Sequence, residues 1–492
     1  MTVIIRQCYN TYKSQIVWKT IKAMSVNSFD SYFLSWRPKR SSLTKPYYLS
    51  LAAELERSIA SGELAEGQKL PPQRELADFL DLDFTTVTRA YNLCREKRLI
   101  YGVTGRGTFI SPQHGDTTAN TSAIELGVVQ SFPEIGGKAI VKAAGNVLER
   151  EYAERMFTYT DKMESRHNLV IAKKWLERCG AKPMIEGIGV FPGVQSAISS
   201  ALLSLFHPGD SLAVDEFTYG NLIHLSRLAH IRLVPIAGDH GGMLPSALND
   251  SVKKYKLKGI FLMPECANPT TLTLSESRKD ALAQVIKKHK LRLLEDDLRI
   301  APIKNKSKTM QDRIPDLTIY LSGSTRTIAP GLRATYLAFP PAVAKPMSSA
   351  LRHLSIKASV LDAEILGELV SSGEAEKVLQ AKLRQAENAN RKFNRIFSIK
   401  NDKNLSRFFR TIPLEGTSGH GMDIERELLS KGIRACHSDR FSVRKGNDKS
   451  FLRVSLSSAG KISRLTNGLN ILKDYLSAFT SFLHHSGDNL FS

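Results

Sequence analysis

The chain has 492 residues, of which 42% are apolar, and it carries a formal net charge of +21 at pH 7. This length exceeds that of one ordinary domain and leaves room for two or three domains, each with its own core. The charge favours a polyanionic partner such as nucleic acid, but it fixes neither the fold nor the specificity.

The five cysteines are scattered through the chain, and none of them forms a C-x-x-C pair. This usage argues against a disulfide framework and against a zinc site, so we predict a reducing compartment and no metal site. No stretch approaches the roughly 18 consecutive apolar residues of a membrane span, and the N-terminus lacks the apolar run of a secretory signal. We therefore expect a cytoplasmic protein without membrane contact.

Residues 1–44 form a basic N-terminal extension. Eight Lys or Arg and a single Asp occur in residues 1–45, and the first 30 residues show no clear period. Two interpretations stay open: an arm that touches DNA phosphate, or a leader that is disordered or no genuine part of the protein. We favour the second, because chain ends are commonly disordered.

Three short helices and a hairpin are predicted in residues 45–111. Apolar residues at helical spacing predict a helix over 47–59, and a Gly- and Pro-containing segment then breaks the chain. Two further helices are predicted over 73–80 and over about 85–97, with a tight turn between them. Two β-prone runs around a glycine turn over 99–111 predict a hairpin. This order is typical of a winged helix-turn-helix.

The same region resembles the DNA-binding domain of GntR-family regulators. Its motifs are L-P-P-Q-R-E-L-A (70–77), T-T-V-T-R-A-Y (85–91) and G-R-G-T-F (105–109). The start of the third helix is expected to reach phosphates or base edges in a major groove, and Arg74 and the wing tip to touch the backbone or the minor groove. Phe84 stands where the family often has Arg. The predicted DNA contacts are Arg74, Thr85, Thr86, Arg89 and Arg106.

Residues 112–122 are polar and aperiodic, which predicts a flexible linker to the remainder, 123–492. In that remainder, apolar β-prone runs alternate with helical patterns. Such alternation predicts an α/β domain with a mostly parallel sheet, in which ligands bind beyond the carboxyl ends of the strands. The predicted strands are residues 211–215, 231–236, 259–264, 291–297, 318–323 and 334–339.

Motifs near these strand ends follow the order found in class I/II aminotransferases, which have the fold-type I architecture and use pyridoxal phosphate. They are F-P-G-V-Q-S-A (191–197), D-E-F-T-Y (215–219), A-N-P-T (267–270), E-D-D-L (295–298) and P-G-L-R (330–333). Each motif is weak alone, and their shared order carries the resemblance. The cofactor-binding positions that it implies are Gly193, Val194, Gln195, Tyr219, Asn268, Asp296, Arg326 and Arg333.

The resemblance also implies what these positions do. The backbone N–H groups at the start of the helix that follows Gly193 hold the phosphate, with Arg333. Tyr219 covers the ring, Asn268 donates to the phenolate oxygen, and Asp296 pairs with the pyridine nitrogen. The segment F-L-R-V-S-L-S (451–457) resembles the one whose arginine, here Arg453, clamps a substrate carboxylate.

A GntR-type winged helix followed by an aminotransferase-like domain is the arrangement of MocR-type transcriptional regulators. The resemblance implies a double-stranded DNA operator, a small-molecule effector, and a homodimer, often domain-swapped. It also implies a large part over about 156–344 and a smaller α+β part made of 123–155 and 345–492.

Three positions depart from the family pattern around the cofactor. Arg326 stands at the Schiff-base lysine, Leu298 at a tyrosine that donates to the cofactor, and Ser322-Gly323 at Gly-Ser. A guanidinium stays protonated and cannot attack an aldehyde, so any bound cofactor is expected to be non-covalent and no catalytic residue is predicted. A substitute lysine among Lys304, Lys306 and Lys308 is disfavoured, since such a polar run is usually a solvated surface.

Three functions therefore remain open. The first is a transcriptional regulator that senses a small anionic metabolite, either pyridoxal phosphate or an amino acid. The second is an active pyridoxal phosphate-dependent aminotransferase that carries a DNA-binding module. The third is a constitutive repressor in which the large domain only dimerises.

Overall fold

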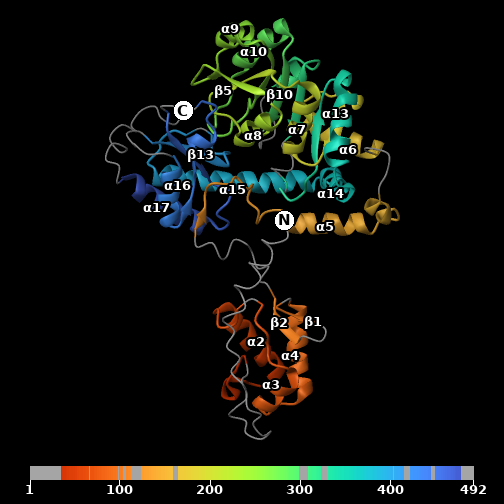
Figure 1. Ribbon diagram of the computed structural model, residues 1–492, viewed down its shortest axis with the longest axis vertical. Coiled ribbons are helices and arrows are strands. Elements are labelled where there is room, and N and C mark those ends of the chain that lie inside the picture. The colour runs from red at the N-terminus through yellow and green to blue at the C-terminus, as the bar shows by residue number, and fades with distance from the viewer. Residues whose placement is uncertain are drawn as a thin grey trace, which may run out of the picture. The chain divides into compact units, whose positions relative to one another are not determined.

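The structure is a computed structural model that describes residues 35–65, 67–97, 99–103, 107–111, 123–158, 165–297, 308–322, 328, 330–402, 404–414, 421–444 and 449–477. The chain divides into two compact units, which we call the winged-helix unit (1–121) and the α/β unit (122–492). Figure 1 shows both, and each is described by itself.

The described residues of the winged-helix unit include the three predicted α-helices and a two-stranded antiparallel hairpin. The second helix has the predicted bounds, and the others agree to within one residue. Ile100 pairs with Ile110 in the hairpin. The elements are α2 (Tyr47–Ala60), α3 (Gln73–Leu80), α4 (Phe84–Glu96), β1 (Ile100–Val103) and β2 (Gly107–Ile110).

The core of this unit explains its helix pattern. Leu76, Val87 and Tyr91 are buried between the three helices, and the Tyr91 hydroxyl donates to the Pro71 carbonyl at 2.9 Å. Asp81 ends α3 in the left-handed conformation with φ 48°, which produces the tight turn before α4.

Residues 35–44 correct one expectation. The sequence assigned them to a disordered extension, but Trp36 and Leu43 are buried in the winged-helix core. The Trp36 indole N–H donates to the Ser58 hydroxyl at 3.1 Å. Burial of the apolar area of Trp36 and Leu43 compensates for the conformational entropy that the segment loses on ordering. The basic residues around them made this segment look disordered in sequence. Residues 1–34 lie outside the described part of the chain.

The α/β unit is built on a seven-stranded sheet in the order β4-β12-β11-β10-β9-β5-β6. Its strands run parallel except β12, which is antiparallel to both of its neighbours. The mostly parallel sheet and its six predicted strands are confirmed, with bounds that shift by at most two residues. The strands are β4 (Ile188–Phe191), β5 (Ser211–Asp215), β6 (Arg232–Ile236), β9 (Leu257–Leu262), β10 (Arg292–Asp297), β11 (Thr318–Ser322) and β12 (Thr335–Ala338).

Helices cover both faces of this sheet. One face packs against α7 (Val194–Leu205), α8 (Gly220–Leu228) and α13 (Pro341–Ser355). The other face packs against two groups of helices (Figure 1). These are α5 (Gly137–Leu148), α6 (Arg166–Arg178) and α14 (Val360–Ser371), and α9 (Pro245–Tyr255), α10 (Glu276–His289) and α11 (Met310–Arg313).

A smaller α+β part follows along the long helix α15 (Glu374–Ile396), which Figure 1 shows between α14 and α17. Its three-stranded antiparallel sheet has the order β13-β16-β15. The short strand β3 (Ile124–Glu125) pairs with β14 (Ile433–Arg434), which ties the start of the unit to this part. The remaining elements are β13 (Phe409–Pro413), α16 (Gly421–Ser430), β15 (Cys436–His437), β16 (Phe451–Ser455) and α17 (Ile462–Ser477).

Three helices that the sequence assigned to the smaller part lie against the large sheet instead. Helix α13 packs on α7, and α5 and α14 pack together over the opposite face. Met347 and Leu351 of α13 are fully buried there. The reason is that the parallel sheet needs apolar cover on both faces, which these helices supply.

Candidate functional site

The start of α7 and Arg333 form one end of the site. Gly193 precedes α7 with φ 84°, and a Cβ built on it would lie 2.6 Å from Nη2 of Arg333. The guanidinium therefore lies directly against the Gly193 backbone, where no side chain fits. The N–H groups of the first turn, including those of Val194 and Gln195, have no partners within the helix and can bind an anion beside this guanidinium.

Asn221 links two predicted residues. Its Nδ2 donates to Gln195 Oε1 at 3.2 Å and to the Tyr219 hydroxyl at 3.1 Å. Tyr219 caps α8, so this amide joins the first turns of α7 and α8. Asn221 was not among the predicted site residues, although it stands only two residues after Tyr219 at the start of a helix.

Asp296 lies on the α7 face of the sheet. Leu294 packs in the cluster around α7, and Leu293 packs on the opposite side against α9 and α10. Side chains alternate along a strand, so Asp296 points to the same side as Leu294. Its carboxylate is fully buried. The neighbouring Asp297 accepts a hydrogen bond from the Tyr320 hydroxyl, so the two acids differ in surroundings.

A cavity of about 470 Å³ opens beside these elements, and its lining includes Tyr219, Asn268 and Arg453. Arg453 lies on β16 and is only 8% exposed. Its Nη1 donates to Asn268 Oδ1 at 2.9 Å, and its Nη2 donates to the Gly127 carbonyl. Residues that are 326 positions apart in sequence thus meet at one guanidinium.

The groups in direct contact with the Arg453 guanidinium are neutral, and the carboxylate of Glu125 acts on it from farther away. Burial lowers the pKa of its guanidinium. Cys436 Sγ lies 3.6 Å from Nη2, the ring of Phe441 is 4.6 Å from Cζ, and Nε has no hydrogen-bond partner within the described residues. Within those residues it also forms no ion pair, so a ligand anion would supply the missing counter-charge.

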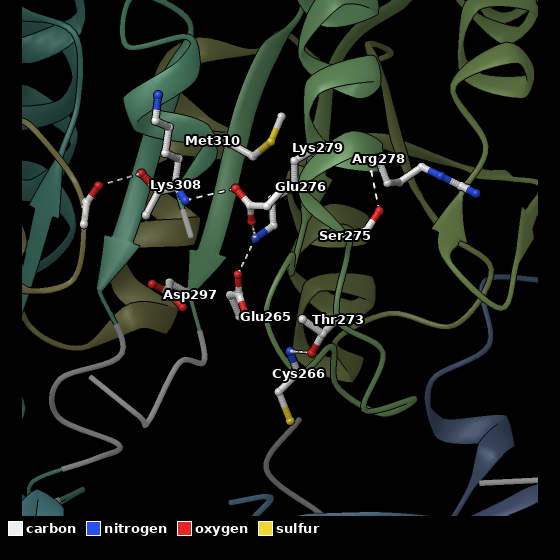
Figure 2. Close-up of polar contacts among 12 residues, drawn as sticks. Glu265, Cys266, Thr273, Ser275, Glu276, Arg278, Lys279, Asp297, Lys308 and Met310 are labelled. Atoms are coloured by element: carbon white, nitrogen blue, oxygen red, sulfur yellow. Dashed lines mark hydrogen bonds and ion pairs between the residues drawn. The ribbon is translucent and has the colours of Figure 1, made fainter. Parts of the chain in front are cut away.

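Buried ion pairs support the loop that carries Asn268. Lys279 on α10 is 1% exposed, and its Nζ contacts Glu265 and, at 3.0 Å, Glu276. Figure 2 shows Lys279 between these carboxylates, with Cys266 donating its backbone N–H to Thr273 Oγ1 at 3.2 Å. The loop is thereby fixed at both ends around Asn268.

Four of the predicted DNA contacts, Arg74, Thr85, Thr86 and Arg89, lie in the N-terminal halves of α3 and α4. Arg74, Thr85 and Arg89 are exposed, and Thr86 is half-buried. The Arg74 guanidinium lies 5.7 Å from the centre of the Phe84 ring, which is itself 43% exposed. Arg106 lies outside the described residues.

The described residues contain no group of three or more His, Cys, Asp or Glu side chains placed to hold a metal ion. None of the helices in the same residues is long and apolar enough to cross a membrane.

Comparison with known proteins identifies both units. Residues 47–110 match the family "Bacterial regulatory proteins, gntR family", and residues 152–472 match "Aminotransferase class I and II". The HTH-type transcriptional regulator YdeF of Bacillus subtilis is 31% identical over 465 residues, which cover 93% of this chain and all of YdeF. The chain belongs to the MocR-type regulators of the GntR family.

Other similar proteins agree with this assignment. The vitamin B6 salvage pathway transcriptional repressor PtsJ of Salmonella typhimurium is 27% identical, with coverage of 48% of this regulator and 54% of PtsJ. Among solved structures, the kynurenine aminotransferase of Pyrococcus horikoshii superposes with a TM-score of 0.66 at 18% identity, covering 74% of this chain and 93% of that one. The structural match establishes the fold alone.

The regulator holds two further ionisable groups with shifted pKa values, Lys382 and Asp215. Lys382 on α15 is 1% exposed, its Nζ donates to the Ile328 carbonyl at 2.8 Å, and burial lowers its pKa to about 8. Asp215 ends β5, and burial raises its pKa to about 7. Asp215 begins the D-E-F-T-Y motif, but the motif assigns no role to it, and Lys382 has no local signal.

Most of the positions that depart from the aminotransferase pattern around the cofactor lie outside the described residues. This holds for Arg326, Leu298 and Gly323, and also for Lys304 and Lys306. Lys308 is described and exposed, and its backbone N–H donates to Glu276 Oε2 at 3.2 Å.

Proposed function

We propose that this DNA-binding transcriptional regulator senses a small anionic metabolite in the cavity beside Arg453. The observation that carries the proposal is a buried guanidinium with only neutral hydrogen-bond partners among the described residues, which faces a cavity of about 470 Å³. An anion that enters gains a charge-assisted contact where little water competes.

The residues at the sheet ends fit pyridoxal phosphate. The first turn of α7 and Arg333 would hold the phosphate. Only glycine fits at position 193, because the Arg333 guanidinium occupies the space that a Cβ would need. The side-chain oxygen of Asn268 accepts a hydrogen bond from Arg453, so its amide N–H groups can donate to a phenolate oxygen. Buried Asp296 would pair with the ring nitrogen, and Tyr219 would lie over the ring. When bound, the cofactor supplies an aldehyde that condenses with amines.

We infer that the cofactor is not attached covalently to the protein. Arg326 occupies the lysine position of the family motif, and its guanidinium stays protonated at any physiological pH. Borohydride treatment of the purified regulator with pyridoxal phosphate, followed by mass spectrometry, is expected to leave the chain unmodified. A stable pyridoxyl adduct on any side chain would overturn this.

One observation favours the alternative, an active aminotransferase. Lys382 is a buried amine with a pKa lowered to about 8, and it touches the backbone two residues after Arg326. If Lys382 were the nucleophile, the regulator would absorb visible light with pyridoxal phosphate, and Lys382→Met would lose that band. We expect no such band in either protein.

On the DNA side, we propose that α4 enters a major groove, with Thr85, Thr86 and Arg89 facing phosphates or base edges. Arg74 and Arg106 would contact the backbone or the minor groove. The exposure of Arg74, Thr85 and Arg89 supports this placement. We also propose a homodimer, which would bind two half-sites.

A thermal-shift and DNA-binding series tests the sensing function. We expect one class of small anion to raise the melting temperature and to change operator affinity. A constitutive repressor would instead show operator affinity that no anion changes.

A further inference from the structure

We infer that the effector is a monocarboxylate with an aromatic or similarly large apolar side chain. This inference rests on the proposed function and adds the chemical class of the ligand. It is drawn from the charges and the surfaces that surround the cavity next to Arg453.

The cavity offers one place for an anion. Two arginines line it, Arg453 and Arg440. The Arg440 guanidinium is already engaged by both carboxylate oxygens of Glu425, with Nε donating to Oε1 at 2.6 Å. Arg453 has no such partner within the described residues and keeps a buried Nε without a hydrogen bond. Among the described residues that line the cavity, a second carboxylate on the ligand would therefore meet no unpaired guanidinium, and His224 is the one other side chain there that can carry a positive charge.

The rest of the cavity wall favours an apolar group. Phe408, Phe409 and Phe441 line it and are nearly fully buried, and Val128 and Val129 add to the same wall. Among the described residues that line the cavity, none is acidic. A ligand ammonium group would gain no counter-charge from the described lining residues, whereas an aromatic ring would bury its area against the apolar part of the wall.

Calorimetric titration of the full chain, freed of pyridoxal phosphate so that probe amines cannot condense with its aldehyde, tests this inference. The probes are phenylpyruvate, phenylalanine, glutamate and alanine. We expect the aromatic probes to bind roughly tenfold to a hundredfold more tightly than alanine, which corresponds to burial of a phenyl group. Phenylpyruvate is expected to exceed phenylalanine. Equal or tighter binding of glutamate would overturn the inference.

Substitutions at Arg453 and Val128 locate the binding. Arg453→Gln is expected to weaken the aromatic probes roughly 30-fold or more, and Arg426→Gln, an exposed arginine on α16, to leave them unchanged. Val128 is 54% exposed, so its replacement leaves the core intact. Val128→Glu should weaken these anions more than the isosteric Val128→Gln does. Undiminished binding to folded Arg453→Gln, or equal binding to the two Val128 variants, would contradict the proposed site.

Operator affinity, measured in the same samples, separates this inference from the sensing function. Aromatic binding without any change in operator affinity would remove the sensing function and leave the ligand class standing. A dicarboxylate that alters operator affinity would support the sensing function and contradict the proposed ligand class.

An independent observation concerns Phe84. It is the first residue of α4, its ring is 43% exposed, and the Arg74 guanidinium lies 5.7 Å from the ring centre. The ring therefore lies at the helix end that is proposed to enter the major groove, outside the core. In that groove the C5-methyl group of thymine is the one apolar feature that distinguishes base pairs. We propose that Phe84 contacts a thymine methyl and sets a sequence preference.

Replacement of thymine by uracil removes only this methyl group. An operator is first selected from random duplexes, and each thymine is then replaced in turn. At one position per half-site we expect affinity to fall about fourfold for the unaltered regulator, the value for one buried methyl, and not at all for Phe84→Ala. Leu49→Ala, an exposed residue of α2, serves as the control and should keep the fourfold difference.

Two outcomes would contradict the role of Phe84. One is salt-dependent duplex binding in which no thymine matters, which leaves the DNA-binding function intact. The other is a uracil effect that persists in Phe84→Ala.

Discussion

The two units place their proposed functional side chains in opposite surroundings. Arg74, Thr85 and Arg89 are exposed on the winged-helix unit, whereas Asn268, Asp296 and Arg453 are buried in the α/β unit. In the first unit, function and stability are therefore separable by mutation. In the second, the groups proposed to bind ligand also join distant segments, so a substitution there alters both.

The buried ion pairs under the Asn268 loop should show the largest effect. Lys279→Met removes the buried amine that pairs with Glu265 and Glu276, and it is expected to lower the free energy of unfolding of the α/β unit by about 3–5 kcal/mol. Urea unfolding measures it. Lys377→Met, whose lysine pairs with Glu374 at the surface, is the control and should cost less than about 1 kcal/mol. Equal losses would show that the Lys279 cluster is not structural.

Gly193 comes next. Gly193→Ala would place a methyl group 2.6 Å from Arg333 Nη2, so we expect a loss of about 1–3 kcal/mol and weaker binding of pyridoxal phosphate. Gly209 has a similar positive φ of 91° and no atom within 4 Å of a built Cβ. Gly209→Ala thus reports backbone strain alone and should leave cofactor titrations unchanged. Loss of cofactor affinity in both variants would argue against the predicted phosphate site.

The exposed side of the comparison is tested by Arg89→Ala. We expect operator affinity to fall by about 1–3 kcal/mol if the guanidinium contacts a base edge, with a melting temperature that stays the same. Electrophoretic mobility shift at several salt concentrations measures the first quantity. A large loss of stability would show that Arg89 supports the fold, as the buried residues of the α/β unit do. Function and stability would then not be separable in the winged-helix unit.

The smallest effect is a pH dependence. The pKa of Asp215 is about 7 in the folded chain and near 3.8 as its ordinary value, so the stability contributed by its protonated form is present below about pH 4 and is lost as the pH rises through 7. Asp215→Asn removes this loss. Its melting temperature should exceed that of the parent by a few degrees at pH 8, with the difference shrinking towards pH 4. A constant difference would assign the effect to packing instead.

Much of the fold could be predicted because its signals are local. The helix at 73–80 is bounded by Pro72 and by the turn at Asp81, and the six predicted strands are apolar runs of parallel-sheet type. The site motifs were visible for the same reason, since each is a short stretch at a strand end.

The residues that were missed depend on contacts between distant segments. Asn221, Lys279 and Lys382 look like ordinary surface residues in sequence, and only the packing of α7, β9 and α15 gives them partners. The assignment of α13 failed because its amphipathic pattern does not say which sheet it covers. Trp36 was hidden by the basic residues that follow it, Arg37, Lys39 and Arg40.

The burial of Trp36 bears on how the DNA-binding unit is to be isolated. A fragment that starts at Tyr47, where the family match begins, would lack the indole that donates to Ser58 and would expose the underside of the helix core to solvent. A fragment that starts at residue 35 keeps that cover. The family boundary is thus a poor cloning boundary for this protein.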